Sequence, residues 1–207
     1  MLVNKTVTGF VEITSSNEPV PGGGSVSALS ASIAAALGEM VANLTIGRKK
    51  YVEVEEEMKE ISEKLCECKK IFLEYIDKDA NSFDEVMQAF GMPKDTDEQK
   101  KARSAAIQAG MKNAAAVPLA VAKGTVEIMP LIKEAVAKGN SNAVTDAAVA
   151  GMQARTAVLG ALYNVKINLG SIKDEEFVAK VSGEVAEIEK QALAIEAEII
   201  SIANSKL

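Results

Sequence analysis

The feature that most constrains the fold is a segment of small side chains at residues 25–46, which reads as a helix with almost no charge. Small residues recur there at intervals of three, four and seven: Ala28, Ala31, Ala35, Gly38 and Ala42. Residues at this spacing share one face of a helix, and the distance between packed helices depends on the side chains at the contact. We therefore expect a buried helix that other helices cross closely.

The rest of the chain also follows helical periodicity, and no segment alternates as a strand would. We expect helices near 7–15, 25–46, 52–90, 96–117, 141–169 and 174–203. Pro118 either kinks the fourth of these or starts a separate helix that runs to Lys138. Long helices joined by short turns predict an all-α, up-and-down bundle of antiparallel neighbours, forming one domain over residues 1–207. Several apolar stripes also predict that two chains pack together as a homodimer.

Composition excludes several partners. The 207 residues carry a net charge of −6 and no long basic block, which argues against binding to nucleic acid. The N-terminus has no signal-peptide apolar core, and no apolar stretch reaches the length of a membrane span without polar interruption. We therefore expect a cytoplasmic protein without a membrane partner.

The chain contains no histidine, which excludes Ser-His-Asp and Cys-His nucleophilic sites and most transition-metal sites. The two cysteines, Cys66 and Cys68, are two residues apart in a helical pattern and so point to different faces. We expect them to be reduced thiols and expect no metal site. Proton transfer would then depend on Asp, Glu, Lys, Tyr, a thiol or water.

Residues 19–25, Pro-Val-Pro-Gly-Gly-Gly-Ser, form a glycine turn ahead of the small-residue helix. A turn of this kind presents free N–H groups at the positive end of a helix, where a carboxylate, a phosphate or a carbonyl oxygen could bind. The spacing matches neither the Walker A pattern nor GxGxxG, and no strand precedes it. Spacing alone therefore favours a plain turn into the helix.

The segment 141–169 places polar residues where apolar ones are expected. Asn142, Asp146, Gln153 and Asn164 share one face with small residues at 3.6 residues per turn. Asn142 by itself reads as a helix cap, but the set is at least as well explained by a polar cavity facing the bundle. Asp146 and Asn164 are roughly 27 Å apart along a helix, so they meet one ligand only if it is long or if a dimer partner supplies the second copy.

Two further clusters of charged residues leave alternatives open. Arg48, Lys49 and Lys50 form either a solvated turn at a helix end or an anion clamp, and position alone does not decide between them. Asp79 and Ser82 belong to a face that reads as mostly exposed, but at a spacing of three they could turn inward together.

Four segments resemble, in order, the hallmark segments of the cyclodeaminase/cyclohydrolase family of folate enzymes: residues 19–25, 41–51, 139–147 and 161–168. The family includes the cyclodeaminase half of formiminotransferase-cyclodeaminase and stand-alone bacterial methenyltetrahydrofolate cyclohydrolases. Together the segments are specific and cover nearly the whole chain. Residues 51–55 and 91–100 look closer to the stand-alone cyclohydrolases.

The resemblance implies a dimer of long antiparallel helices with a folate site near the glycine turn. It also implies hydrolysis of 5,10-methenyltetrahydrofolate to 10-formyltetrahydrofolate. The alternative is cyclisation of 5-formiminotetrahydrofolate to the methenyl form with release of ammonia, and a second alternative is a non-catalytic folate-binding protein. Both reactions need an acid/base group, and we expect no cofactor beyond the folate substrate, in mono- or polyglutamylated form.

For the folate reactions that the resemblance implies, Asp146 is the first choice for proton transfer, because partial burial among small apolar residues would raise its pKa. Asp79 is the second choice. Arg48, Lys49 and Lys50, with Lys166 as a weaker candidate, would bind the glutamate carboxylates. The full set expected to bind substrate is Pro21, Gly22, Gly23, Gly24, Ser25, Asn43, Arg48, Lys49, Lys50, Asn142, Asn164 and Lys166. Among these, the three asparagines would orient the pterin or the water.

Overall fold

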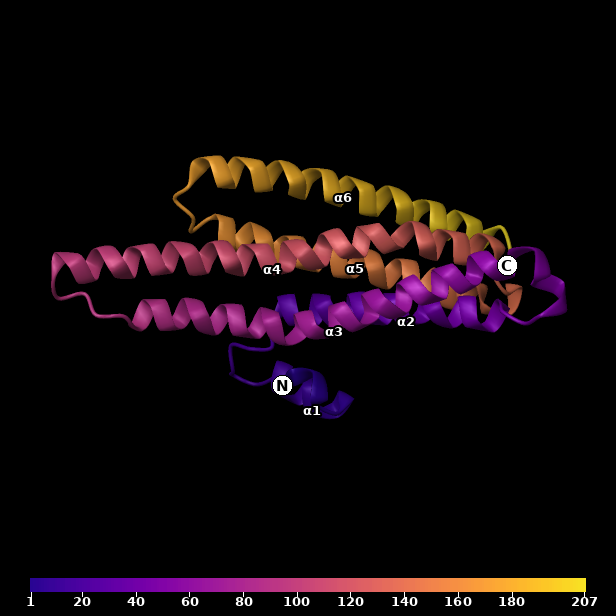
Figure 1. The fold of residues 1–207 in the computed structure, drawn as a ribbon, viewed down its shortest axis with the longest axis horizontal. Helices are drawn as coiled ribbons and strands as arrows, with labels where there is room; N and C mark the ends of the chain where they lie inside the picture. The colour runs from indigo at the N-terminus through magenta and orange to yellow at the C-terminus, as the bar shows by residue number, and fades with distance from the viewer.

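A computed structural model describes all 207 residues, which form six α-helices and no strand (Figure 1). Three short 3₁₀ turns, at Leu2–Asn4, Lys49–Val54 and Ser141–Ala143, accompany them. The helices are α1 (Val7–Thr14), α2 (Gly23–Thr45), α3 (Glu55–Gly91), α4 (Asp97–Lys138), α5 (Val144–Leu169) and α6 (Glu175–Asn204). The all-α prediction is confirmed.

The helix ends are stabilised by capping residues that can be recognised in the sequence. The Thr6 hydroxyl accepts a hydrogen bond from the Gly9 N–H at 3.0 Å and so caps α1. Thr96 and Gln99 form the expected capping box at the start of α4, where each side chain bonds the other residue's backbone. Gly47 follows the end of α2 with a φ of 74°, a left-handed conformation that glycine adopts without a steric penalty.

Residues 97–138 form one continuous helix, α4, with Pro118 and Pro130 inside it. Of the two readings left open for Pro118, a separate helix beginning there is wrong. An internal proline removes one backbone hydrogen bond and crowds the preceding turn. Pro118 is itself buried in α4, which packs against α2, α3, α5 and α6. This packing keeps the helix continuous across the proline.

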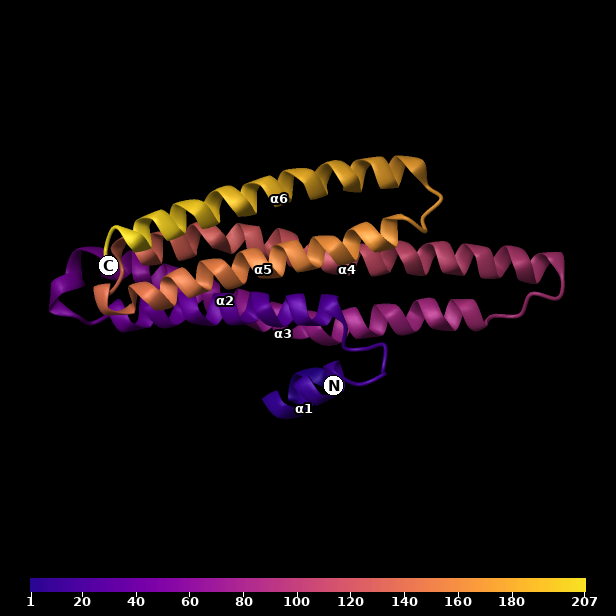
Figure 2. The ribbon, with the colours of Figure 1, turned by 180° about the vertical axis from the view of Figure 1, so that it is seen from behind.

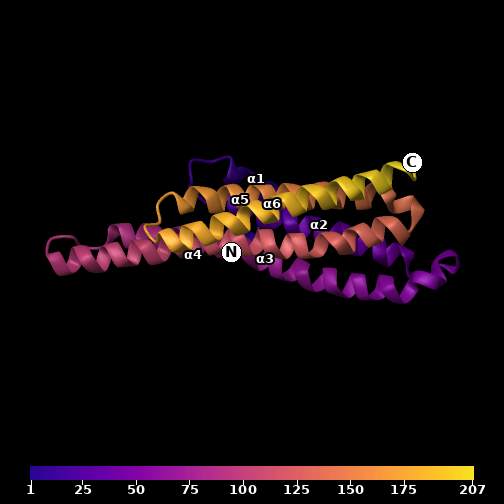
Figure 3. The same ribbon diagram turned by 90° about the horizontal axis from the view of Figure 1, so that it is seen from above.

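Helix α2 packs beside α3 and α5 and against α4, with one side left exposed, while α6 covers α4 and α5 (Figures 1 and 3). The small residues on its face are fully buried, as predicted. A Cβ atom added at Gly38 would lie 2.8 Å from Leu65 Cδ1 and 3.2 Å from Ile132 Cγ1. The absence of larger side chains is therefore what lets three helices approach α2.

Helices α3 and α4 are much longer than α2 and α5. At about 1.5 Å per residue, the 37 residues of α3 span roughly 55 Å and the 23 of α2 roughly 34 Å. The α3–α4 hairpin therefore projects beyond the rest of the bundle (Figures 1 and 2). At the base of this projection the glycine turn enters α2, and α5 ends beside it.

Two helices, α2 and α4, are long and apolar enough by composition alone to cross a membrane. This differs from the expectation that every apolar stretch is interrupted, because the interruptions in α2 are mostly serines and glycines rather than charges. In each helix, 56% of the most apolar 18-residue segment is buried within the bundle. Core helices of soluble proteins pass the same test, so the finding is weak evidence for a membrane.

A pair of glycine substitutions tests the close packing of the helices. Gly183 on α6 has open space around it, so Gly183→Ala should raise the free energy of unfolding by about 0.5–1 kcal/mol through helix propensity. At Gly151 on α5, a Cβ would lie 2.8 Å from Ile199 Cγ2 on α6. Gly151→Ala should therefore lower stability despite the same propensity gain. Urea denaturation at one protein concentration measures both, and equal gains would contradict the packing.

Candidate active site

A hollow of about 400 Å³ lies at the base of the α3–α4 projection, between the start of α2 and the end of α5. The side chains and backbone that line it come from the glycine turn, α3, α4 and α5. They are Pro19, Val20, Gly22, Gly23, Gly24, Asp79, Ser82, Phe83, Val86, Met87, Phe90, Met111, Ala114, Asn164, Ile167 and Asn168. The structure therefore brings the glycine turn together with Asp79 and Asn164, three of the features singled out in the sequence.

Asp79 reaches from α3 to the first turn of α2. Its Oδ2 lies 2.9 Å from the Ser25 hydroxyl, which is also 3.0 Å from the Ile76 carbonyl and can donate to either acceptor. Oδ1 lies directly against Gly24, where an added Cβ would overlap the carboxylate. Glycine at position 24 is therefore a steric requirement for the position of this carboxylate, rather than a requirement of backbone conformation.

Burial raises the pKa of the Asp79 carboxyl above its ordinary value of 3.8, and hydrogen bonds from Ser25 offset part of this rise. The carboxyl is the one charged group in the hollow. It therefore retains a proton to higher pH than an exposed aspartate, which suits a group that gives and takes protons.

Asn164 lies across the hollow from Asp79, at the end of α5. Its amide nitrogen donates to the Gly160 carbonyl at 2.9 Å and would lie 3.0 Å from a Cβ added at Gly23. The second glycine of the turn therefore lets this amide lie against the backbone. Its carbonyl oxygen has no hydrogen-bond partner within the chain, so it is available to a ligand.

Phe83, Met87 and Phe90 form an apolar wall on the projecting part of α3. They follow one helical stripe and are 36%, 52% and 44% exposed. Met87 is exposed because α2 and α5 end before they could cover it. Flat aromatic and polarizable side chains of this kind pack well against a planar ring. The sequence analysis did not predict this wall, although the apolar residues of α3 continue beyond the part of the helix that α2 and α5 can cover.

Six of the other expected site residues lie at the opposite end of the bundle. Asn43, Arg48, Lys49, Lys50 and Asn142 are exposed there, and Asp146 is half-buried in the first turn of α5. Asp146 is 18 residues from Asn164, roughly 27 Å along the helix. The first-choice carboxylate is therefore not in the same hollow as the glycine turn of its own chain.

The polar face of α5 does not line the hollow as a set. Of the polar face, only Asn164 lines the hollow, and Asn142 is exposed. The physical reason is that alanines and valines of α5 fill the contact with α2 and α4, so the polar face lies at the margin of that contact. Lys166 lies on the α6 side, where it pairs with Glu189 at 2.8 Å, and Pro21 is buried in the turn without lining the hollow.

Hydrogen bonds hold the turn that contains Arg48, Lys49 and Lys50 against the start of α5. The Asn140 N–H donates to Thr45 Oγ1 at 2.8 Å, and the Ser141 N–H donates to the Tyr51 hydroxyl at 2.9 Å. Hydrogen bonds from Ser141, and more weakly from Lys50, lower the pKa of Tyr51 to about 8. Tyr51 stands beside the three expected cations but was not itself expected to act.

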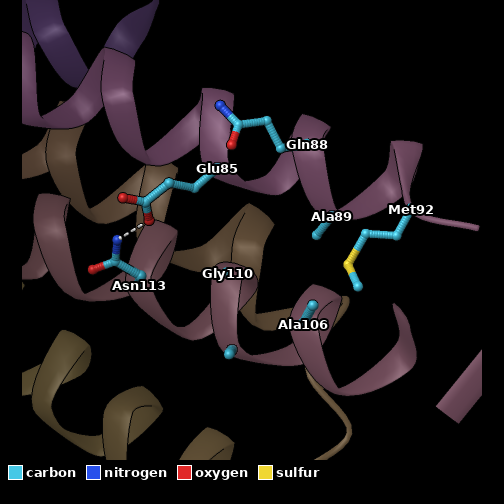
Figure 4. A pocket seen from close by; sticks show the side chains of 8 residues that line it. Glu85, Gln88, Ala89, Met92, Ala106, Gly110 and Asn113 are labelled. Atoms are coloured by element: carbon cyan, nitrogen blue, oxygen red, sulfur yellow. Dashed lines mark hydrogen bonds between the residues drawn. The ribbon is translucent and has the colours of Figure 1, made fainter. Parts of the chain in front are cut away.

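A second hollow lies farther along the α3–α4 hairpin (Figure 4). Its one charged group, the Glu85 carboxylate, accepts a hydrogen bond from the Asn113 amide at 2.7 Å. The remaining lining is mostly small or apolar and includes none of the expected site residues. Across the chain, no group of three or more His, Cys, Asp or Glu side chains is placed to hold a metal ion.

Comparisons with known proteins show which proteins the chain is similar to. The chain is 39% identical over all 207 residues to methenyltetrahydrofolate cyclohydrolase from Methylorubrum extorquens, and the match covers both proteins fully. It is 34% identical over 191 residues to formimidoyltransferase-cyclodeaminase from Sus scrofa, covering 92% of this chain but only 35% of that protein. The structure superposes on formiminotetrahydrofolate cyclodeaminase from Thermotoga maritima with a TM-score of 0.89 and 28% identity, covering 99% and 98% of the two chains.

The family described as formiminotransferase-cyclodeaminase matches residues 6–187, most of the chain and all of the hollow. With the full-length relative at 39% identity, this match shows that the chain belongs to the formiminotransferase-cyclodeaminase family.

Proposed function

We propose that this protein hydrolyses 5,10-methenyltetrahydrofolate to 10-formyltetrahydrofolate in one-carbon metabolism. The observation that carries the proposal is the half-buried Asp79 carboxyl held against Gly24 in a hollow with an aromatic wall. A full-length relative named as a methenyltetrahydrofolate cyclohydrolase supports this reaction over others in the family.

In the proposed mechanism the pterin lies against Phe83 and Met87, with the reactive carbon facing Asp79. The carboxylate takes a proton from a water molecule as the water's oxygen bonds to the carbon between N5 and N10. The tetrahedral intermediate collapses when the bond to N5 breaks: Asp79 returns its proton to that nitrogen, and the hydroxyl proton leaves to water as the oxygen becomes the formyl carbonyl. Asn164 orients the water or the ring, and no resident cofactor is required. Asp79 thus takes the role first given to Asp146.

The alternative activity is closure of 5-formiminotetrahydrofolate with release of ammonia. It is supported by the similarity to a cyclodeaminase in structure and to the pig enzyme in sequence. The same carboxyl would then protonate the departing nitrogen. A non-catalytic folate-binding protein remains the third candidate, and it predicts binding without conversion.

We further propose a cytoplasmic homodimer. The exposed sides of α2 and α5 carry large apolar side chains, including Ile33 at 40% and Met152 at 44% exposure. Between Gly22 and Ile46 the only charged residue is Glu39, which pairs with Lys69. Depletion of charge with retention of apolar side chains is typical of the core of a subunit interface.

Substrate conversion distinguishes the three candidates. Purified protein should consume methenyltetrahydrofolate, measured as loss of its near-UV absorbance, and should release little ammonia from formiminotetrahydrofolate. Faster ammonia release would favour the cyclodeaminase, and tight folate binding without turnover would favour the non-catalytic protein. In the same assay Asp79→Asn should lower kcat by about 10²–10⁴-fold, because it removes the proton-transfer group.

Asp84→Asn is the matched control for this change, because Asp84 is an exposed aspartate on the same helix outside the hollow. It should retain wild-type kcat. If Asp79→Asn retains activity and Asp146→Asn loses it, the sequence-based preference for Asp146 is restored.

The glycine turn provides a second pair of variants. Gly24→Ala should abolish turnover, because the added Cβ overlaps the Asp79 carboxylate and displaces it. Gly22→Ala should retain most activity, because the nearest atom to its added Cβ is the Pro19 carbonyl oxygen at 3.6 Å, an ordinary contact. Circular dichroism of both variants confirms folding, and equal activities would contradict a steric role for Gly24.

The raised pKa of Asp79 predicts that Asp79→Asn, which lowers kcat, raises the free energy of unfolding near pH 7. Its contribution to stability is fully present below pH 3.8, where the unfolded carboxyl is also protonated, and is lost as pH rises through the raised folded pKa. Asp79→Asn, which stays neutral, should therefore be more stable than wild type near pH 7 and show little difference near pH 4. Thermal melts of both proteins across this range measure the difference, and a destabilised variant at pH 7 would contradict it.

A further inference from the structure

Asn168 lines the hollow from α5, one helical turn beyond Asn164, and takes no part in the proposed mechanism. Its side-chain nitrogen donates two hydrogen bonds, to the backbone carbonyl of Ala114 on α4 at 2.8 Å and to that of Asn164 at 2.9 Å. A primary amide has two N–H donors and one carbonyl oxygen, so both donors are used within the chain. Because the nitrogen lies between two carbonyl oxygens, the opposite orientation of the amide would place oxygen against oxygen.

The Ala114 carbonyl accepts this bond because of Pro118. In a continuous α-helix the carbonyl of residue 114 accepts a hydrogen bond from the N–H of residue 118, and a proline has no N–H. Ala114 is only 8% exposed, and a buried carbonyl without a donor is unfavourable. Asn168 supplies the missing donor from the neighbouring helix. Pro118 therefore frees the acceptor that fixes the orientation of the Asn168 amide.

Two amide oxygens on one face of α5 are left without a partner. Asn164 and Asn168 are four residues apart, so their side chains are neighbours, about 6 Å apart along the helix axis. Each uses its nitrogen on backbone carbonyls, and neither oxygen accepts a hydrogen bond within the chain. Both residues are half-buried and line the hollow. The α5 side of the hollow therefore suits a ligand edge that carries N–H donors.

The ring system of the proposed substrate has such an edge. The 2-amino group of a pterin and the neighbouring N–H at N3 both donate. This donor edge is at the opposite end of the ring system from the carbon between N5 and N10. The hollow is divided in the same way, with Asn164 and Asn168 on α5 and the Asp79 carboxyl on α3. A ring bound by its donor edge at α5 would therefore place its reactive carbon toward Asp79.

We propose that Asn168, together with Asn164, determines specificity for the pterin ring by accepting hydrogen bonds from its 2-amino and N3 donors, and that Pro118 positions Asn168 by freeing the Ala114 carbonyl. This inference rests on the proposed folate function for its ligand, whereas the orientation of the two amides rests on contacts within the chain. Such a site rejects a ring without these donors, because its amide oxygens would then lose their partners.

A pair of ligands tests the donor edge by binding alone. Isothermal titration calorimetry compares 5-formyltetrahydrofolate, a stable reduced folate, with its analogue in which a methyl group replaces the 2-amino group. Wild type should bind the 2-amino ligand about tenfold more tightly, the effect of one good hydrogen bond. Asn168→Ala should weaken binding of the 2-amino ligand by about the same factor and change binding of the 2-methyl ligand little. An equal loss for both ligands, or a wild type that does not distinguish them, overturns the proposal.

Pro118→Ala tests the positioning without altering Asn168 itself. The change restores the N–H of residue 118, which competes with the Asn168 amide for the Ala114 carbonyl. KM for methenyltetrahydrofolate should rise about 3–10-fold with kcat near the wild-type value, because binding is lost and the proton-transfer group is kept. Pro130→Ala is the matched control, because Pro130 lies in the same helix, is exposed and does not line the hollow. It should retain the wild-type KM, and a folded Pro118→Ala protein that also retains it overturns the role of Pro118.

The same measurements separate this inference from the proposed function. A wild-type protein that turns over methenyltetrahydrofolate but binds both ligands equally would contradict the donor edge and leave the function standing. Binding that depends on the 2-amino group, without turnover, would contradict the hydrolase and leave the donor edge standing. A wild type that binds neither ligand overturns both.

Discussion

The close approach of helices to α2 is the constraint on which the rest of the structure depends. Fully buried alanines and Gly38 leave room for larger side chains of neighbouring helices, such as Leu65 and Ile132, to pack directly against α2. This contact fixes the height of α2 against α3, and thereby sets Gly24 beside Asp79. A larger residue on the small face would displace α3 and α5 from α2, and with them the carboxyl and the amide of the hollow.

Partial burial of the Asp79 carboxyl in the hollow is unfavourable for its ionised form, but it suits the proton transfer proposed for this group. A carboxyl that loses water is more easily protonated, and only the Ser25 bonds and the positive end of α2 offset the cost of its ionised form. Proton transfer near neutral pH requires such a group, and a site without histidine has few other means of supplying it. The loss of stability caused by burying the ionised Asp79 carboxyl is therefore coupled to the chemistry proposed for this group.

Much of the fold and part of the site could be predicted from the sequence, because their causes are local. The caps at Thr6 and Thr96 and the glycine after α2 depend on neighbours within four residues. The continuity of α4 through Pro118 could not be predicted, because packing against other helices decides it. The preference for Asp146 over Asp79 was made on helical spacing, which gives the face of a residue but not what lies opposite it. The exposure of Met87 could not be predicted for the same reason, since apolar residues have the same periodicity in the buried and the projecting parts of α3.

By itself, the sequence determined the helical class, the close packing at α2, the membership of a folate-enzyme family and the exclusion of histidine as an acid/base. Residue spacing, the absence of histidine and the order of its characteristic segments contain that information. Only the tertiary structure decided which carboxyl meets the glycine turn, and that the basic turn lies at the opposite end of the bundle. The reason is that both depend on the relative lengths of α2 and α3 and on which helices lie side by side. Residues far apart in sequence meet where α2 and α5 stop and α3 continues.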